Sequence, residues 1–374
     1  MRAIGVILAG GNNSKMKELS SKRAIGAMPI AGSYRAIDFA LSNMTNSHIQ
    51  KVAVLTQYNA WSLNEHLNSS KWWDFGRKQG GLFVFTPSIT SDNGFWYRGT
   101  ADAIAQNISF LKKSHEPYVI IAPGDAVYKM DYNKVLEYHV DKQAEITIVC
   151  KKFNEGEDVS RFGVVQVDED GRINDFEEKP VEEVNSRIVS TGIYVIRRRL
   201  LIELIEKCVE EGRYDIVNDI IIRNKKTKKI YAYMMDGYWS NISTVESYYK
   251  TNMEFLNRDI RDYFFKQYPD VYSKVDDFAP AKYNPGANVR NSLISSGCII
   301  NGTVENSVIF KKAYIGNNCH IINSIILNDV YIGDNVYIEN CIVESHDTIN
   351  NNSVFKGENG EIKIVLERNA RYRM

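Results

Sequence analysis

The sequence predicts an α/β domain with a mostly parallel sheet, followed by a left-handed parallel β-helix. Two patterns lead to this prediction. Short apolar runs alternate with amphipathic stretches over the first two thirds of the chain, and aliphatic residues recur at intervals of six after residue 289. The chain has 374 residues, which is more than one compact domain usually holds, so we expect two domains.

The alternation in the first part of the chain predicts βαβ units. We expect strands at 3–8, 52–56, 118–122 and 145–149, and helices at 35–46, 100–113 and 133–142. Strands separated by helices favour a mostly parallel sheet. Ligands of such sheets bind beyond the carboxyl ends of the strands, so the loops after Leu8 and Ala122 are the first places to look for chemistry.

The six-residue period in the last part of the chain fits a coil of three short strands, each with one aliphatic residue pointing inward. A β-sandwich with coincidental spacing is the alternative. The step of five from Ile321 to Ile326 indicates a bulge or loop between coils. The positions that carry the period are Leu293, Ile294, Ile299, Ile300, Ile309, Ile315, Ile321, Ile326, Ile332 and Ile338.

A charged, aromatic segment with two prolines separates the two patterns. We therefore predict an α/β domain over 1–256, a linker over 257–285 and the β-helix over 286–374. A solenoid leaves the strand edges of its terminal coils unpaired, and such edges invite another chain to dock. We expect an oligomer, with a tetramer as the assembly.

Composition and charge exclude several classes of protein. The apolar fraction is 44%, and 46 basic residues balance 46 acidic ones, so no overall field attracts nucleic acid or an anionic membrane. The chain opens on a buried-strand pattern, and no apolar run is long enough to span a bilayer. We expect a cytoplasmic protein with no nucleic-acid partner and no membrane contact. Its five cysteines lack CxxC spacing and are expected to be structural.

A small-residue turn follows the first predicted strand at Leu8, Ala9, Gly10 and Gly11. Backbone amides in such a turn can approach phosphate oxygens, although a Gly-Gly pair alone is equally typical of a tight turn. Further motifs follow in order: Asp38-Phe39-Ala40-Leu41-Ser42-Asn43, Trp96-Tyr97-Arg98-Gly99-Thr100-Ala101-Asp102, Pro123-Gly124-Asp125, Phe162-Gly163-Val164, Glu177-Glu178-Lys179-Pro180, Thr191-Gly192-Ile193-Tyr194 and Gly237-Tyr238-Trp239-Ser240-Asn241.

This series closely resembles the glucose-1-phosphate adenylyltransferases (ADP-glucose pyrophosphorylases) over essentially the whole chain. The resemblance implies a sugar nucleotidyltransferase domain that transfers an adenylyl group from ATP to glucose 1-phosphate, with Mg²⁺ held by two carboxylates. It places the sugar phosphate on Tyr97, Gly163, Glu178, Lys179, Ser190, Asp215 and Trp239, the nucleotide on Leu8, Ala9, Gly10, Gly11, Gly99 and Asp102, and the metal on Asp125. Taken singly, Trp239 is also typical of a core aromatic, Lys179 of a solvated surface and Asp125 of a turn.

The sequence departs from the family where ATP and the metal would bind. The family loop, in outline Gly-Gly-x-Gly-(Ser/Thr)-Arg-Leu-x-Pro followed by Arg-Ala-Lys-Pro, here has Asn13, Lys15, Glu18, Ile25 and Gly26 at the changed positions. Asn241 stands where the second metal carboxylate belongs, and Ser243 replaces a glycine. These changes remove backbone clearance, a two-pronged arginine, a cation and a hard metal ligand. A tolerant loop with compensating changes elsewhere is the alternative.

These departures favour a regulatory, non-catalytic subunit of a bacterial ADP-glucose pyrophosphorylase in glycogen synthesis. Such a subunit would be weak or inactive alone and would modulate an intact catalytic subunit in a hetero-oligomer. It would keep a sugar-phosphate pocket and weakened ATP contacts, with doubtful Mg²⁺ binding. A self-sufficient sugar-1-phosphate nucleotidyltransferase and a sugar-phosphate-sensing binding protein are the alternatives.

Overall fold

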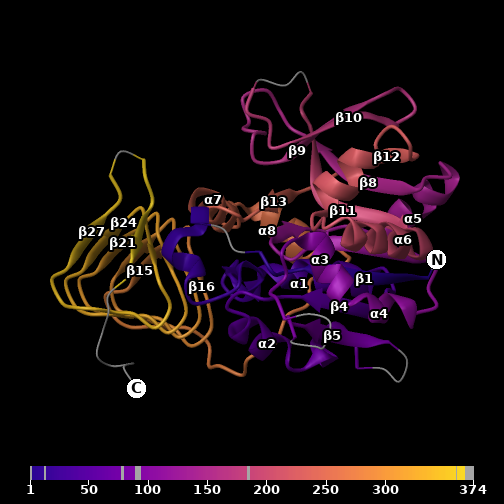
Figure 1. Cartoon of the computed structure of the whole chain (residues 1–374). Coiled ribbons are helices and arrows are strands. Elements are labelled where there is room, and N and C mark those ends of the chain that lie inside the picture. The colour runs from indigo at the N-terminus through magenta and orange to yellow at the C-terminus, as the bar shows by residue number, and fades with distance from the viewer. Residues whose placement is uncertain are drawn as a thin grey trace.

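The chain forms an α/β domain and a β-helix that lie side by side, with helix α7 (Val245–Glu254) between them (Figure 1). The computed structural model describes residues 2–11, 14–76, 80–88, 94–182, 186–358 and 360–366. None of the helices within these ranges is long and apolar enough to cross a membrane.

A nine-stranded sheet forms the centre of the α/β domain, in the order β10-β9-β11-β6-β1-β4-β5, with β8 pairing to β11 and β12. All of its strands run in one direction except β10 and β11. The predicted mostly parallel sheet is confirmed. Its strands are β1 (Ala3–Leu8), β4 (Lys51–Leu55), β5 (Gly81–Phe85), β6 (Tyr118–Pro123), β8 (Ile146–Lys152), β9 (Gly163–Val167), β10 (Ile173–Glu178), β11 (Ile188–Arg197) and β12 (Ile230–Met234).

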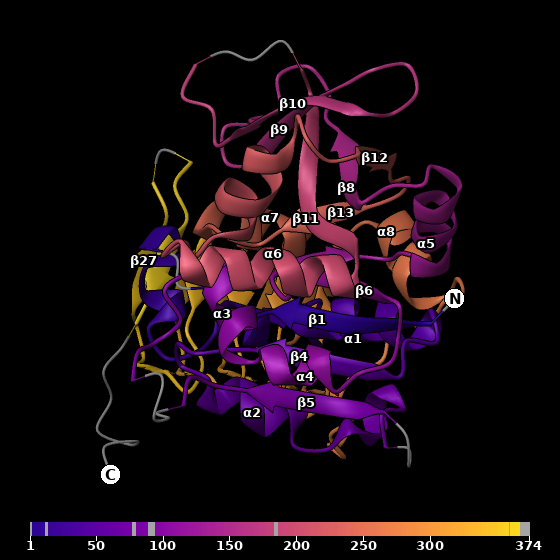
Figure 2. The same cartoon turned by 45° about the vertical axis from the view of Figure 1, so that its right-hand side comes forward.

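Helices cover both faces of this sheet (Figure 2). Along β6, Val119 and Ile121 pack into one apolar core with α3, α4 and α6, and Ile120 and Ala122 pack into the other with α1 and α5. Side chains alternate in this way because successive residues of a strand point to opposite faces. The helices are α1 (Ala36–Asn46), α2 (Trp61–Leu67), α3 (Thr100–Gln106), α4 (Ile108–Lys112), α5 (Tyr132–Asp141), α6 (Arg198–Glu210), α7 (Val245–Glu254) and α8 (Arg258–Phe265).

The helix expected over 100–113 is two helices, α3 and α4, separated at Asn107. The Asn107 side chain donates to the Ala103 carbonyl at 2.9 Å and to the Tyr97 hydroxyl at 2.9 Å. Asn interrupts helices because its side chain competes for backbone partners. The shorter elements of the domain are η1 (Ser14–Ser20), η2 (Ile25–Ala27), η3 (Ser70–Trp73), η4 (Ile216–Ile222), β2 (Pro29–Ile30), β3 (Tyr34–Arg35), β7 (Ala126–Tyr128) and β13 (Trp239–Asn241).

Three parallel five-stranded sheets form the walls of the predicted β-helix, which is confirmed. The segment predicted as a linker, 257–285, begins with α8 and ends in the first wall strand. The walls are β14 (Lys282–Tyr283), β17 (Ile299–Ile300), β20 (Tyr314–Ile315), β23 (Tyr331–Ile332) and β26 (Thr348–Ile349); β15 (Asn288–Arg290), β18 (Thr303–Glu305), β21 (His320–Ile322), β24 (Tyr337–Glu339) and β27 (Val354–Lys356); and β16 (Leu293–Ile294), β19 (Val308–Ile309), β22 (Ile325–Ile326), β25 (Cys341–Val343) and β28 (Lys363–Val365).

The five-residue step from Ile321 to Ile326 is not the bulge that the sequence suggested. His320 pairs with Thr303 and with Tyr337, so a full coil takes 17 residues here. The short step recurs in the next coil, from Ile338 to Val343. Each of these corners holds an asparagine with positive φ, such as Asn323 at 46°. Asparagine tolerates this left-handed conformation better than most residues, so the corner is a regular part of the coil.

The wall formed by β16, β19, β22, β25 and β28 serves two cores. Ile309 and Ile326 point into the β-helix, and their neighbours Val308 and Ile325 pack outward against the α/β domain. The segment 8–29, which the resemblance expects to bind phosphate, is called the phosphate loop here. On the α/β side this second core includes Met16, Leu19, Ile25 and Met28 of that loop, together with residues of α7 and α8. The loop expected to grip phosphate therefore packs against the β-helix.

Two adjacent isoleucines test which side chains of the coil point into the β-helix core and which point outward. Ile300 is fully buried, and Ile299 keeps 37% of its surface exposed. We expect Ile300→Ala to lower the free energy of unfolding by about 2 to 5 kcal/mol, because it leaves a cavity in the β-helix core. Ile299→Ala should cost less than about 1 kcal/mol. Urea denaturation followed by circular dichroism measures both losses, and equal losses would contradict the assignment.

Candidate functional site

A cavity of about 300 Å³ opens at the carboxyl ends of β1 and β6. Its position agrees with the rule that ligands of α/β sheets bind beyond the carboxyl ends of the strands. The cavity brings together seven residues expected from the sequence: Leu8, Ala9, Gly11, Asp125, Glu178, Lys179 and Asp215. The remaining lining consists of Ile25, Gly26, Thr100, Pro123, Gly192, Tyr194, Ile216 and Val217.

Three charged side chains occupy one side of this cavity. Lys179 Nζ lies 3.2 Å from the Glu178 carboxylate, and 66% of the lysine side chain is exposed. Asp215 accepts a hydrogen bond from the Thr100 hydroxyl at 3.2 Å and caps η4 by accepting from the Asn218 amide. Burial raises the pKa of Glu178, which the neighbouring Lys179 partly offsets. An exposed cation beside two carboxylates suits a ligand that carries both a phosphate and hydroxyl groups.

Lys179 has an unusual backbone conformation, with φ at +50°. Non-glycine residues in this left-handed region carry strain of about 1 kcal/mol or more, which is often found at functional sites. The Lys179 amide donates to the Phe162 carbonyl at 3.0 Å, which holds this conformation. In this conformation Lys179 follows the end of β10 and lines the cavity.

Gly163 and Ser190 lie beside the cavity without lining it. A Cβ at Gly163 would stand 2.9 Å from the Glu178 carboxylate and would clash with the Phe176 ring, so only glycine leaves room for Glu178. Buried Ser190 accepts from the Gly192 amide at 3.3 Å, where β11 bends. Both residues shape the pocket, and the structure shows no direct contact from either to its interior.

Three further residues expected to bind ligand do not line the cavity. They lie at or just before the N-terminus of α3: Tyr97, Gly99 and Asp102. The Gln57 side chain accepts a hydrogen bond from the backbone amide of Tyr97 at 2.9 Å and donates one to the backbone carbonyl of Tyr97 at 3.2 Å. Asp102 accepts from the Arg98 amide at 2.8 Å and pairs with its guanidinium. A Cβ at Gly99 would collide with the backbone carbonyl of residue 214. Gly10, packed near β4, also lies outside the cavity lining.

Trp239 belongs to an aromatic cluster with Phe153 and Phe162, with ring centroids 6.1 and 5.4 Å away. Its indole N–H is buried and has no hydrogen-bond partner among the described residues. The residue does not line the cavity. The structure thus places Trp239, which the resemblance expected at the sugar phosphate, in the apolar core of the α/β domain.

The two positions that the resemblance links to a metal lie next to each other. β7 and β13 pair antiparallel with Asn241 opposite Ala126, which brings Asn241 beside Asp125. The Asn241 amide nitrogen lies 3.5 Å from the backbone carbonyl of Asp125, and its amide oxygen accepts from the Ser243 N–H at 3.1 Å. Burial raises the pKa of the Asp125 carboxyl. Among the described residues no group of three His, Cys, Asp or Glu side chains could hold a metal ion.

The phosphate loop closes the cavity with apolar and small residues. Ile25 and Gly26 line it at the positions where the resemblance expects a lysine and a proline. Asn12 and Asn13 lie outside the described residues. The lining residues Gly192 and Tyr194 belong to a motif quoted from the sequence, but their place in the wall follows only from the structure.

An ion pair to the β-helix holds this loop in place. The Arg23 guanidinium pairs with the Glu344 carboxylate and donates to the Ser345 hydroxyl at 3.3 Å. Glu344 is completely buried, and the Arg23 side chain is 11% exposed. The sequence did not indicate this contact, because its partners are 321 positions apart and belong to no shared motif.

The fold and the site define a nucleotidyltransferase with C-terminal hexapeptide repeats. Residues 4–258 match the family described as nucleotidyl transferase, and residues 277–361 match the family described as GlmU-like, C-terminal hexapeptide.

Individual relatives narrow this class. The chain is 41% identical over 321 residues to the glucose-1-phosphate adenylyltransferase of Pseudothermotoga lettingae, which covers 85% of this chain and 76% of the relative. It is 39% identical over 319 residues to that of Clostridium novyi (84% and 83% covered) and 37% identical over 318 residues to that of Geobacillus stearothermophilus (84% and 82%). This chain belongs to the glucose-1-phosphate adenylyltransferase family.

Breaking the buried ion pair between loop and β-helix should destabilise the chain strongly, because the remaining charge loses its partner in a poorly hydrated place. Glu344→Gln removes the charge and leaves the buried Arg23 unpaired, so we expect unfolding to become easier by about 3 kcal/mol. Glu305→Gln is the control, because the pair of Glu305 with Arg290 is exposed and should contribute only about 0 to 1 kcal/mol. Guanidinium titration of both variants measures the difference. A Glu344 variant as stable as the control would contradict the role of the pair.

Proposed function

We propose that this chain is the regulatory, non-catalytic subunit of a bacterial ADP-glucose pyrophosphorylase. It binds glucose 1-phosphate or a related sugar phosphate and modulates an intact catalytic subunit within a cytoplasmic hetero-oligomer, most simply a tetramer. The observation that carries the proposal is Asn241, which faces Asp125 where a second carboxylate would be needed for catalysis.

The reaction of the family explains why this replacement matters. A phosphate oxygen of the sugar phosphate forms a bond to the α-phosphorus of ATP, and the bond from that phosphorus to the bridging oxygen breaks to release pyrophosphate. The protein must align two anions and stabilise the charge between them. Loss of one such stabilising group commonly costs about 10² to 10³ in rate.

The residues present do not fit a two-carboxylate magnesium site. Magnesium prefers oxygen ligands and near-octahedral geometry. The Asn241 oxygen already accepts a bond from Ser243, and its amide nitrogen, which cannot bind a cation, is the atom directed at Asp125. We therefore assign no chemical step to a metal in this chain. Ile25 in the cavity wall also provides no charge for a triphosphate, so ATP binding is weak.

The sugar-phosphate side of the cavity supports retained binding. The exposed Lys179 ammonium provides a cation for a phosphate, and Glu178 and Asp215 provide acceptors for sugar hydroxyls. A self-sufficient transferase is the second candidate, favoured by Asp125 together with Lys179. A sugar-phosphate sensor without a transferase partner is the third, favoured by the same binding residues.

The test of modulation measures pyrophosphate release from ATP and glucose 1-phosphate by this chain, by an intact catalytic homologue, and by their mixture. We expect little turnover by this chain and a changed rate or regulation in the mixture, with a complex visible by size-exclusion chromatography. Robust turnover by this chain alone would support the self-sufficient transferase. Absence of any effect on the partner, with tight sugar-phosphate binding, would support the sensor.

A lysine substitution tests the sugar-phosphate pocket independently of catalysis. Lys179→Gln should weaken glucose 1-phosphate binding about tenfold or more in calorimetry, because it removes the cation that meets the phosphate. Lys250→Gln is the matched control: Lys250 is 70% exposed and pairs with Glu254 at 3.8 Å, far from the cavity. Equal affinities of the two variants would show that the phosphate binds elsewhere.

Restoring the family residues tests whether the changed loop and metal positions cause the expected low activity. The combination Asn13→Gly, Lys15→Arg, Ile25→Lys and Asn241→Asp should raise turnover by at least about 10²-fold, because it returns one cation, the two-pronged contact of an arginine and a metal carboxylate. The same variant without Asn241→Asp is the control and should gain much less. An unchanged rate in the folded quadruple variant would show that the loss of activity has another cause.

A further inference from the structure

Asp215 of the sugar-phosphate pocket lies on a segment that is locked to the start of α3. The backbone amides of Ala101 and Asp102, in the first turn of that helix, donate to the Tyr214 carbonyl at 2.8 and 3.2 Å. Arg98 Cζ lies 3.9 Å from the centroid of the Tyr214 ring, and the guanidinium donates to the Tyr214 hydroxyl at 2.8 Å. The carbonyl satisfies amides that a helix cannot bond internally, so the segment and the helix hold each other in place.

The described residues fill most of the acceptor positions of the Asp215 carboxylate, and the position that remains is on the oxygen next to Thr100. Oδ1 of Asp215 accepts from the Asn218 backbone amide at 2.8 Å and from the Asn218 side-chain amide at 3.1 Å. Oδ2 accepts from the Thr100 hydroxyl at 3.2 Å. An ionised carboxylate offers about four acceptor positions. Oδ2 can therefore accept one more hydrogen bond, and Asp215 lines the cavity from which a ligand would donate it.

Thr100 fixes the direction of that oxygen. The Thr100 hydroxyl accepts from the Ile216 backbone amide at 2.9 Å. A hydroxyl carries a single hydrogen, so the hydrogen of Thr100 is directed at Asp215 Oδ2. Ile216 follows Asp215 directly, so this one hydroxyl holds both the side chain of Asp215 and the backbone that carries it. Linked hydrogen bonds strengthen one another, and a β-branched threonine has few side-chain rotamers, so the arrangement is well defined.

We propose that Thr100 is a positioning residue that determines which phosphate esters the pocket accepts, by holding Asp215 Oδ2 where it receives one hydroxyl of the sugar. This inference rests on the proposed binding of a sugar phosphate at the same cavity. Lys179 provides the cation for the phosphate, so the pair of Thr100 and Asp215 acts on the sugar alone. An acceptor that is held in place for a hydroxyl is left unpaired by an ester without one, and this penalty makes the pocket selective.

The test compares glucose 1-phosphate with inorganic phosphate, which has no sugar hydroxyl, by calorimetry. Thr100→Val keeps the shape of the side chain and removes the hydroxyl, so it should weaken glucose 1-phosphate binding about tenfold and leave phosphate binding unchanged. Thr100→Ser keeps the hydroxyl and should stay within about twofold of the natural chain. Thr227→Val is the matched control, because the exposed Thr227 hydroxyl bonds to the Asn224 carbonyl at 3.3 Å and does not line the cavity.

A double-mutant cycle shows whether Thr100 acts through Asp215. Asp215→Asn exchanges the carboxylate for a neutral amide of the same shape and should itself weaken glucose 1-phosphate binding. In that background Thr100→Val should cause less than about a twofold further loss, because residues of one hydrogen-bond network do not contribute additively. A further loss of about tenfold would show that Thr100 acts independently of Asp215.

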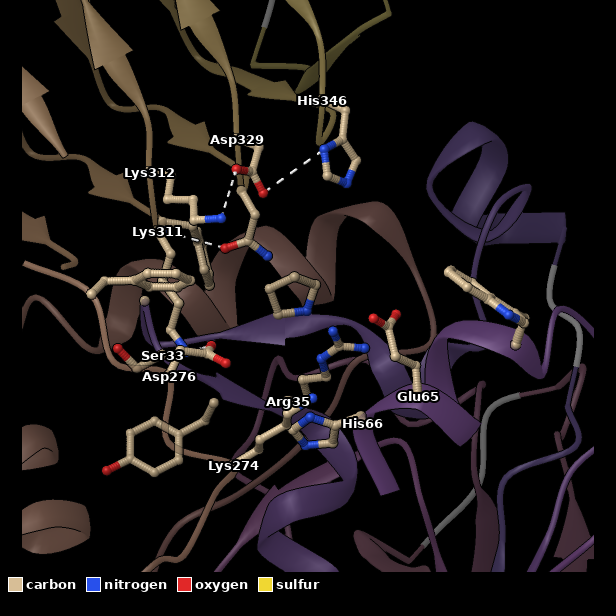
Figure 3. A pocket seen from close by; sticks show the side chains of 17 residues that line it. Ser33, Arg35, Glu65, His66, Lys274, Asp276, Lys311, Lys312, Asp329 and His346 are labelled. Atoms are coloured by element: carbon tan, nitrogen blue, oxygen red, sulfur yellow. Dashed lines mark hydrogen bonds and ion pairs between the residues drawn. The ribbon is translucent and has the colours of Figure 1, made fainter. Parts of the chain in front are cut away.

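Lys179→Gln keeps the cations of a second cavity apart from this measurement. That cavity lies between the α/β domain and the β-helix (Figure 3), and it shares no lining residue with the sugar-phosphate pocket. There Lys311 Nζ lies 2.8 Å from the Asp276 carboxylate, and Lys312 Nζ lies 3.6 Å from the Asp329 carboxylate. Phosphate attracted by these lysines would not respond to Lys179→Gln, so only the binding that Lys179→Gln weakens is assigned to the sugar-phosphate pocket.

Four results would overturn the inference: equal glucose 1-phosphate affinities of Thr100→Val and Thr227→Val, equal losses for glucose 1-phosphate and inorganic phosphate in Thr100→Val, a loss in Thr100→Ser as large as in Thr100→Val, or additive losses in the cycle. If Lys179→Gln weakens glucose 1-phosphate binding while Thr100→Val does not, the proposed sugar-phosphate site stands and the role of Thr100 falls. If the natural chain binds no glucose 1-phosphate, both fall.

Discussion

The packing of one β-helix wall against the phosphate loop is the constraint on which the rest of the structure depends. Val308, Ile325 and Ile342 alternate along that wall with residues of the β-helix core, so a single sheet serves two apolar cores. Met16 and Leu19 of the loop are completely buried in the outer core. Since protein interiors are closely packed, neither the loop nor the wall can shift without disturbing the other.

This constraint explains how the loop keeps its place although it departs from the family pattern. Ile25 adds apolar surface to the same core, and it lines the cavity where the resemblance expects a lysine. The Arg23 pair with Glu344 then fixes the chain between η1 and η2. The loop is therefore held by packing and by one buried ion pair, and its fold does not require a bound nucleotide. The residues that hold the loop differ from most of those that line the cavity, so substitutions in the cavity can leave the fold of the loop intact.

Periodic features of the fold could be predicted from the sequence, and contacts without a period could not. The strands β1, β4 and β6 follow from apolar runs, and the β-helix follows from the six-residue spacing. The five-residue step was misread because one occurrence looks like an irregularity, although its recurrence makes it part of the coil. The cavity residues Glu178, Lys179 and Asp215 were expected from the family resemblance, and the structure brings them together. No local pattern relates Asp276 to Lys311, or Arg23 to Glu344, because only the packing of the two domains brings these charges together.

The environment of Asp125 gives a physical reason for Asn241. Burial already raises the pKa of the Asp125 carboxyl. A second carboxylate in that position would raise it further unless a cation lay between the two, because like charges at close range disfavour ionisation. An asparagine avoids this repulsion, and its amide instead bonds the Asp125 backbone and the turn at Ser243. Asn241 thus stabilises the pairing of β7 with β13 without a metal, and it supports the fold beside the cavity at the carboxyl ends of β1 and β6.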